Sequence, residues 1–444
     1  MYKRVLTSWA AAGFLALLAA CSDVTSPVDA QPIDITLDFC ATQTPVWFAY
    51  QNVGEAGWTR VIPDVSGTVR FSAARRVAIA YVLLSGADAV TQIIGAANTE
   101  LQAISEVACQ DESGAKQLNG SVTGATGSQL SQITMFFASA YLPSSQSTFS
   151  LTQLADRSLD LIASRVNLSG TTTQTSDRVI IRRSQNYVNN ATIPALDFNG
   201  VEAFSPTTSA VNVSGAVSGE QTLLYEDFFS QLKTSHVLFF SQLSGNGSVV
   251  VPTIPAAQTA AGDYHDLFVT ANSADGSSFR GAESYFRNPP SSQNLPVGPA
   301  ITTNPQFTTL DETPYVRLRM FLAIGANSYN RAVNFEFDQQ QQFTSTQWSV
   351  LVTEGFYNFN PTAWEVDMPD FSGTDGWQSS WGLQTGSPID WRVTAYYGRP
   401  ALLLGADPTE GEGIQFAGRQ ALPAPLQAAR AGISVPLRRS VVRR

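Results

Sequence analysis

Beyond residues 1–20 the sequence shows almost no apolar pattern of helical period, and this restricts its fold more than any other feature. Apolar runs are short, rich in β-branched and aromatic residues, and end at Gly, Pro, Asn or Ser. Such runs predict strands joined by turns. With 32 Gly and 23 Pro in the chain, we predict an all-β protein. It should contain two or three antiparallel β-sandwich or barrel-like domains.

Turn-rich breaks divide the chain into units. We expect a β domain over 36–115, a β-sandwich module over 116–215 and a larger antiparallel β domain over 216–404. Residues 405–444 begin acidic, end basic and have a middle rich in Ala and Pro. This composition predicts a loosely ordered tail.

Four patterns predict individual strands. Residues 77–84 are apolar throughout, as in a strand buried on both faces, and 315–322 alternate, as in a strand with one buried face. A third run, 133–141, predicts a single strand. Phe-Phe-Ser-Gln-Leu occurs at 228–232 and 239–243, which indicates two strands of one hairpin, or chance, in preference to a repeat architecture.

The N-terminus has the layout of an export signal. Lys3 and Arg4 precede an apolar stretch, residues 5–20, that ends Leu18-Ala19-Ala20 before Cys21. A basic start, a short apolar core and small residues at the end are typical of a secretory signal peptide. The stretch is too short for a stable membrane span.

Leu18-Ala19-Ala20-Cys21 also resembles the lipobox of bacterial lipoproteins. The resemblance implies removal of residues 1–20, acylation of Cys21, a lipidated tether over 21–35, and an anchor in the outer membrane or at the cell surface of a bacterium. The alternative is an ordinary signal peptide that happens to carry a Cys at the cleavage point.

A second resemblance covers about 116–166. The order Gly120-Ser121-Val122, then 149–154, then 159–163 is similar to small transthyretin-like β-sandwich modules of surface proteins. The resemblance implies a β-sandwich and no particular activity.

Cys40 and Cys109 are the only cysteines left beyond Cys21. In an exported chain an even pair predicts a disulfide. It would close a loop of about seventy residues and stabilise the fold by roughly 4 kcal/mol. Two free buried thiols are the alternative, and two cysteines are too few for a protein-only metal site.

The formal net charge is −10. An acidic chain argues against nucleic-acid partners and against binding to anionic lipid by charge. We therefore expect contact with the membrane through the N-terminal lipid, a possible glycan or envelope protein as partner, and no cofactor.

Motifs for hydrolases and nucleotide binding (G-x-S-x-G, H-E-x-x-H and the P-loop) are missing from the sequence. His236 lies in an apolar run, which favours a structural strand residue. Asp263 and His265 are two residues apart, so on a strand they would share a face and could form a metal or acid–base pair. No third ligand is visible. The alternative is a turn before a strand, in which Asp263 accepts hydrogen bonds from backbone amides.

Asp367, Asp370 and Asp375 lie in a glycine-containing loop that could bind Ca²⁺. Their spacing departs from the D-x-D-x-D-G pattern. A plain Asp/Gly turn is therefore favoured, and we predict no metal site.

Trp364, Trp377 and Trp381 belong to a segment dense in aromatic residues. Exposed, they would be candidate ligand-binding aromatics that stack on sugars or contact a protein partner. Buried, they would form the core of a β domain, which the sequence favours.

The leading hypothesis for function is a non-catalytic one, namely a lipid-anchored envelope protein that binds or scaffolds. The alternative is an envelope hydrolase acting on glycan or peptide with carboxylates such as Asp263, Asp266, Asp367 or Asp370. Such an enzyme would need two carboxylates about 5–9 Å apart across a groove.

Overall fold

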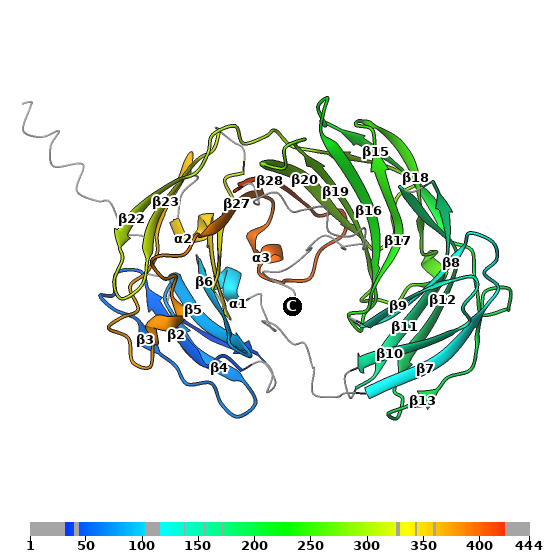
Figure 1. The fold of residues 1–444 in the computed structure, drawn as a ribbon, viewed down its shortest axis with the longest axis horizontal. Coiled ribbons are helices and arrows are strands. Elements are labelled where there is room, and N and C mark those ends of the chain that lie inside the picture. The colour runs from blue at the N-terminus through cyan, green and yellow to red at the C-terminus, as the bar shows by residue number, and fades with distance from the viewer. Residues whose placement is uncertain are drawn as a thin grey trace, which may run out of the picture.

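The fold is almost entirely β-structure (Figure 1), which confirms the predicted class. The computed structural model describes residues 32–39, 44–102, 116–136, 138–154, 157–170, 172–325, 329–341, 344–357 and 361–421. Cys21, Cys40 and Cys109 lie outside these ranges, as does the signal peptide.

One large sheet runs through the described part of the chain. In spatial order its strands are β3 (Thr59–Arg60), β2 (Trp47–Asn52), β5 (Arg76–Ser85), β6 (Asp88–Ala97), β25 (Ser345–Thr353), β24 (Ala332–Gln340), β27 (Asp390–Tyr397), β28 (Gly413–Gln420), β20 (Ser278–Phe286), β19 (Tyr264–Asn272), β16 (Gln221–Phe229), β17 (Ser235–Leu243), β12 (Thr173–Gln185), β11 (Leu159–Ser169), β8 (Leu130–Met135) and β9 (Ala138–Pro143). Neighbouring strands are antiparallel except β6 and β25, which are parallel.

Smaller sheets pack against the large one. They contain β1 (Ile33–Asp38) with β4 (Thr68–Ala73); β10 (Thr148–Leu154), β7 (Lys116–Thr123), β13 (Ala191–Thr192) and β14 (Leu196–Asp197); β18 (Gly247–Thr253), β15 (Thr207–Ser214) and β21 (Ser292–Pro296); and β22 (Gln306–Asp311), β23 (Arg317–Ala323) and β26 (Ala363–Asp367). Short helices complete the described structure: α1 (Asn98–Gln102), α2 (Glu354–Tyr357), α3 (Pro400–Leu403), and the 3-10 turns η1 (Ala256–Gln258) and η2 (Ser379–Trp381).

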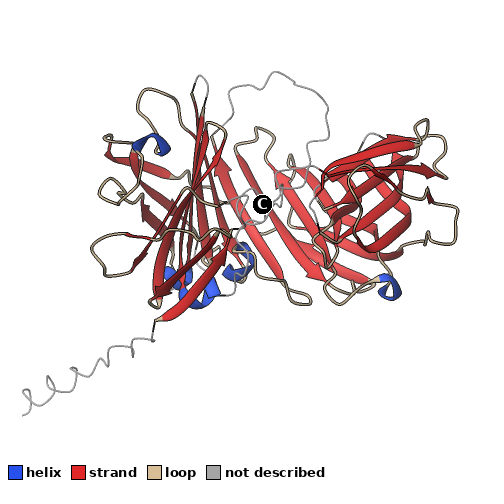
Figure 2. Cartoon of the chain, turned by 90° about the horizontal axis from the view of Figure 1, so that it is seen from below, coloured by secondary structure: helices blue, strands red, loops and turns tan. Residues whose placement is uncertain are grey.

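The large sheet bends into an arch (Figure 1), and Figure 2 shows its strands side by side from below. The sheets β22–β23–β26 and β18–β15–β21 cover its convex face. On the concave face, β1 and β4 with α1 cover one end, and β7, β10, β13 and β14 cover the other. The middle of the concave face, from β24 to β17, lies between these two small sheets.

Alternation along each strand accounts for these layers, because successive side chains point to opposite faces. In β5, Val82 and Ala80 pack under β23 on the convex side, whereas Tyr81 and Ile79 pack under β1 and β4. Burial of side chains of this size stabilises a fold by roughly 1.5–3 kcal/mol each. Both faces of the β2–β5–β6 region are therefore core, as the apolar run 77–84 predicts.

Two further strand predictions are confirmed. The alternating run 315–322 overlaps β23 from Arg317 onward, and Leu318, Met320 and Leu322 of this strand are buried. The second Phe-Phe-Ser-Gln-Leu segment lies in β17, whereas the first starts in β16 with Phe228 and Phe229 and continues into the turn. Strands β16 and β17 pair antiparallel as one hairpin.

The single strand predicted over 133–141 is wrong. The chain turns at Phe136, whose φ is +57°, and forms the hairpin of β8 and β9, in which Ile133 faces Ala140. Residues 131–135 of β8 are buried, whereas β9 is mostly exposed. Both strands nevertheless carry apolar residues, so composition alone does not reveal the turn.

The loosely ordered tail predicted from residue 405 is also incorrect for its first part. Residues 413–420 form β28, which hydrogen-bonds to β27 on one side and to β20 on the other. Its Ile414, Phe416 and Ala417 are buried. Because acidic and Ala/Pro-rich segments flank this short strand, the composition of 405–444 does not reveal it. Residues 422–444 lie outside the described structure.

Candidate functional site

Asp263, half of the sharpest polar pair in the sequence, lies in the turn that precedes β19 and is buried. Its Oδ1 accepts hydrogen bonds from the amide of Gln231 and from Arg183, and its Oδ2 accepts from the amide of Ala260 and from Arg183. Arg183 also binds Asp160, at 3.1 Å. Asp263 thus stabilises a turn and neutralises the charge of Arg183. This agrees with the alternative from the sequence, a turn in which Asp263 accepts hydrogen bonds from backbone amides.

His265 does not pair with Asp263 by a hydrogen bond. Its Nδ1 lies 2.5 Å from Oε1 of Glu226 on β16, and both side chains are completely buried. Burial lowers the pKa of His265 to about 4, against the opposing influences of the Ile254 carbonyl and of Asp263. The ring is therefore neutral at pH 7, and Nδ1 shares a hydrogen bond with Glu226. Sequence reasoning missed Glu226 because only the register of β16 with β19 brings it there.

His236 on β17 is completely buried between hydroxyls of two neighbouring strands. Its Nδ1 lies 2.8 Å from Oγ1 of Thr134, and its Nε2 lies 2.8 Å from Oγ of Ser164. Burial lowers its pKa to about 3. Both ring nitrogens are satisfied, so the arrangement is a structural one, as its apolar setting predicts.

The three aspartates considered for a Ca²⁺ loop, for which the sequence favours a plain turn, form separate ion pairs. Asp367 binds Arg319 through both oxygens, at 2.7 and 2.9 Å. Asp370 lies 3.3 Å from Arg317, and Asp375 lies 2.8 Å from Arg60. The described residues contain no group of three or more His, Cys, Asp or Glu side chains that could hold a metal ion.

The tryptophans proposed as ligand-binding aromatics mostly face the core. Trp364 is completely buried and Trp381 is 7% exposed. Trp377 is partly buried against Trp47, Phe371 and Trp381, with ring centroids 4.7–5.5 Å apart. These contacts pack the segment between β26 and β27 against β2 of the large sheet, which is the core role that the sequence favours.

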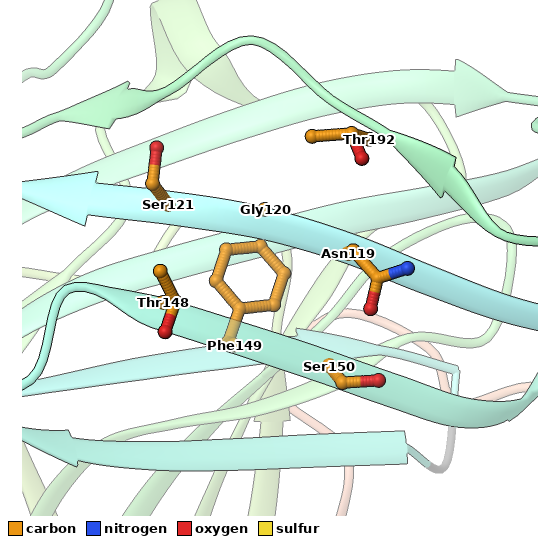
Figure 3. A pocket seen from close by; sticks show the side chains of 7 residues that line it. All are labelled: Asn119, Gly120, Ser121, Thr148, Phe149, Ser150 and Thr192. Atoms are coloured by element: carbon orange, nitrogen blue, oxygen red, sulfur yellow. The ribbon is translucent and has the colours of Figure 1, made fainter.

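A pocket of about 490 Å³ lies over the small sheet of β7, β10 and β13 (Figure 3). Its polar lining residues are Asn119, Ser121, Thr148, Ser150 and Thr192. In the antiparallel register Asn119 faces Ser150 and Ser121 faces Thr148, so their side chains alternate with the inward-facing ones. The lining therefore offers hydroxyl and amide groups and no titratable group.

The floor of this pocket is Gly120 with Phe149. A Cβ on Gly120 would lie 2.4 Å from the Phe149 ring, so the ring packs directly against the glycine backbone (Figure 3). Small polar residues alternating with apolar ones in 118–122 and 148–151 are the sequence signal for this surface. That pattern also fits any solvated strand face, so it does not distinguish a binding site.

The described helices include none that is long and apolar enough to cross a membrane. No protein-family model and no curated protein matches the sequence. Among solved structures, the chain is weakly similar to the TIE protein of Bacillus anthracis, with a TM-score of 0.14 and 8% identity over 60% of this chain and 51% of that one. It thus spans about half of the Bacillus protein. It is also similar to the FN1–FN3 domains of chicken CNTN1, with a TM-score of 0.15 and 6% identity over 63% of this chain and 93% of that one.

Proposed function

We propose that this protein is an exported, lipid-anchored envelope lipoprotein with a non-catalytic binding role, and that the pocket over β7, β10 and β13 takes a neutral polar ligand such as a glycan. The lining of that pocket carries the proposal, because neutral hydroxyl and amide groups bind sugars by hydrogen bonds and supply no acid, base or nucleophile activated by a neighbouring base.

The state of the candidate catalytic groups supports the same function. Asp263 and Asp367 each bind an arginine, and His236 is held between two hydroxyls. Asp266 is completely buried on β19, opposite Asp227 on β16. A hydrolase would need carboxylates that substrate can reach.

Binding is tested with the full chain and insoluble peptidoglycan sacculi. The protein should co-sediment with the sacculi and release no soluble fragments. Ser150→Arg, which fills the pocket, should reduce co-sedimentation by about tenfold. The control Ser248→Arg, at an exposed position of β18, should bind as wild type. Fragment release that is lost in Asp266→Asn would favour the hydrolase instead.

The anchor is tested by replacing the proposed lipid acceptor. Cys21→Ala should move the protein from the membrane fraction to the soluble fraction, because the acyl chains supply the membrane affinity. Protease added to intact cells should digest the wild-type protein if it faces outward. A Cys21→Ala protein that stays in the membrane fraction would contradict lipidation.

A further inference from the structure

The side-chain amide of Asn119 has a fixed orientation in the pocket of Figure 3. Its Oδ1 accepts a hydrogen bond from Nε2 of Gln117, which lies 3.1 Å away and two residues earlier on the same face of β7. The amide oxygen is therefore turned toward Gln117, and Nδ2 keeps two N–H groups. Among the described residues none accepts a hydrogen bond from Nδ2. These donors are therefore available to a molecule in the pocket.

Hydroxyl groups flank Asn119 on both neighbouring strands. Ser150 on β10 and Thr192 on β13 are its direct cross-strand neighbours, and both line the pocket. Neighbouring strands lie about 4.7–4.9 Å apart, so the three side chains form a short row across the sheet. Within the described structure neither hydroxyl hydrogen-bonds to another protein group. Each can therefore accept a hydrogen bond from a ligand.

This row matches an acetamido group in both polarity and charge. The carbonyl oxygen of an acetamido group only accepts hydrogen bonds, which fits the donors of Asn119, and its N–H fits a hydroxyl oxygen. A sugar hydroxyl carries its donor and its acceptor on one atom, whereas an acetamido group carries them on two atoms that can each approach a different strand. The group is also neutral, so it needs no counter-charge in a pocket whose lining has none.

We propose that the pocket over β7, β10 and β13 recognises the acetamido group of N-acetylated sugars. Nδ2 of Asn119 donates to the acetamido carbonyl oxygen, and the acetamido N–H donates to the hydroxyl of Ser150 or Thr192. Asn119 is then the residue that determines specificity, and Gln117 is a positioning residue that orients it. This proposal rests on the proposed glycan-binding function and narrows its class of ligand.

Isothermal titration calorimetry of the full chain with two matched soluble glycans tests the class of ligand. Chitotetraose and cellotetraose have the same linkage and differ in carrying an acetamido group or a hydroxyl group on each sugar. Chitotetraose should bind at least about tenfold more tightly, because it alone satisfies the donors of Asn119 with a carbonyl oxygen.

The outcomes separate this proposal from the function on which it rests. Equal affinity for the two glycans would overturn acetamido recognition and leave glycan binding in place. Binding of neither glycan would overturn both. A short alanine peptide also carries amide groups, so displacement of chitotetraose by this peptide at equal concentration would assign the pocket to peptides and overturn the proposal.

The role of Asn119 is tested by Asn119→Asp, which keeps the shape of the side chain and replaces its N–H donors with an acceptor oxygen. The preference for chitotetraose over cellotetraose should disappear. The control Asn212→Asp makes the same change in charge at an exposed position of β15 and should keep the preference. An Asn119→Asp protein that still prefers chitotetraose would contradict the assigned role.

Gln117→Glu tests the positioning role without changing any residue that lines the pocket. The new carboxylate cannot donate, so Asn119 should turn Nδ2 toward it and present Oδ1 to the ligand. The preference for chitotetraose should therefore fall, whereas Gln117→Lys, which keeps a donor, should retain it. Unchanged thermal midpoints show that the variants are folded. A full preference in a folded Gln117→Glu protein would overturn the orientation on which the proposal depends.

Discussion

At the residue scale, the two buried histidines have hydrogen-bond partners on other strands of the large sheet. His236 lies between Thr134 and Ser164, and His265 contacts Glu226. Each histidine is neutral because burial lowers its pKa, to about 3 for His236 and about 4 for His265. Their hydrogen bonds satisfy buried polar groups and tie strands of the sheet together, which is a structural role.

These two histidines predict acid-sensitive stability. The unfolded chain binds a proton near pH 6.5, whereas each folded-state pKa is lower, so the stabilisation is present above pH 6.5 and is lost as the pH falls toward 4. By pH 4.5 the loss should be on the order of 2 kcal/mol per histidine. Urea unfolding of wild type, His236→Asn and His265→Asn between pH 7 and 4.5 measures it. Each variant should show a shallower pH dependence, and an unchanged slope in both would refute this account.

Gly281 gives a second prediction at this scale. A Cβ there would lie 2.2 Å from the backbone oxygen of Val269, which cannot move aside as a side chain can. Gly281→Ala should therefore lower the free energy of unfolding by about 2 kcal/mol or more. The matched control is Gly57→Ala, where a Cβ meets nothing within 4 Å. Equal denaturation midpoints for the two variants would show that the strand relaxes freely.

At the element scale, local sequence patterns predicted some strands correctly and failed to predict others. Alternation predicted the strand and buried face of β23, and a hairpin, the arrangement of β16 and β17, was one of the two explanations offered for the repeated Phe-Phe-Ser-Gln-Leu. These features depend on neighbours in sequence. The contacts His265–Glu226 and Asp227–Asp266, and the inward position of Trp364, depend on the register of segments far apart in the chain. No pattern within one segment encodes that register, so the candidate sites could not be assembled from sequence alone.

The prediction at the element scale concerns the contribution of strand β28 to folding. Its residues 413–419 pair with β20 and its residues 415–420 pair with β27. A chain that ends at residue 412 should fail to yield monomeric folded protein, because two long strand edges are then exposed. A chain that ends at 421 keeps every pair of β28 and should remain folded. Size-exclusion chromatography and circular dichroism compare the two, and monomeric, folded protein from the shorter chain would contradict this role.

At the scale of the whole molecule, the large sheet connects the three units expected from the sequence. Strand β6 from the first unit pairs in parallel with β25 from the third, and β12 from the second pairs with β17 from the third. Leu351 and Ala332 pack in the same cluster as Phe48 and Ile79. The units therefore share cores as well as hydrogen bonds.

This continuity predicts one cooperative unfolding transition. Calorimetry of the full chain should show a single peak with equal calorimetric and van't Hoff enthalpies. Val350→Ala in β25 should shift the whole peak downward, because its cavity weakens a core that several strands share. Two resolved peaks, with only one displaced by Val350→Ala, would show that the units unfold independently.

The position of β28 also determines when the two sides of the arch can join during synthesis. The strands from β3 to β27 form one side of the arch and those from β20 to β9 form the other, and β28 lies between them although it is the last described strand in chain order. During synthesis the two sides can be joined only after residues 413–420 have emerged. Until then β27 and β20 each keep an open edge, which invites pairing with other chains. We therefore expect the two sides of the arch to join only when β28, the last described strand, has been added.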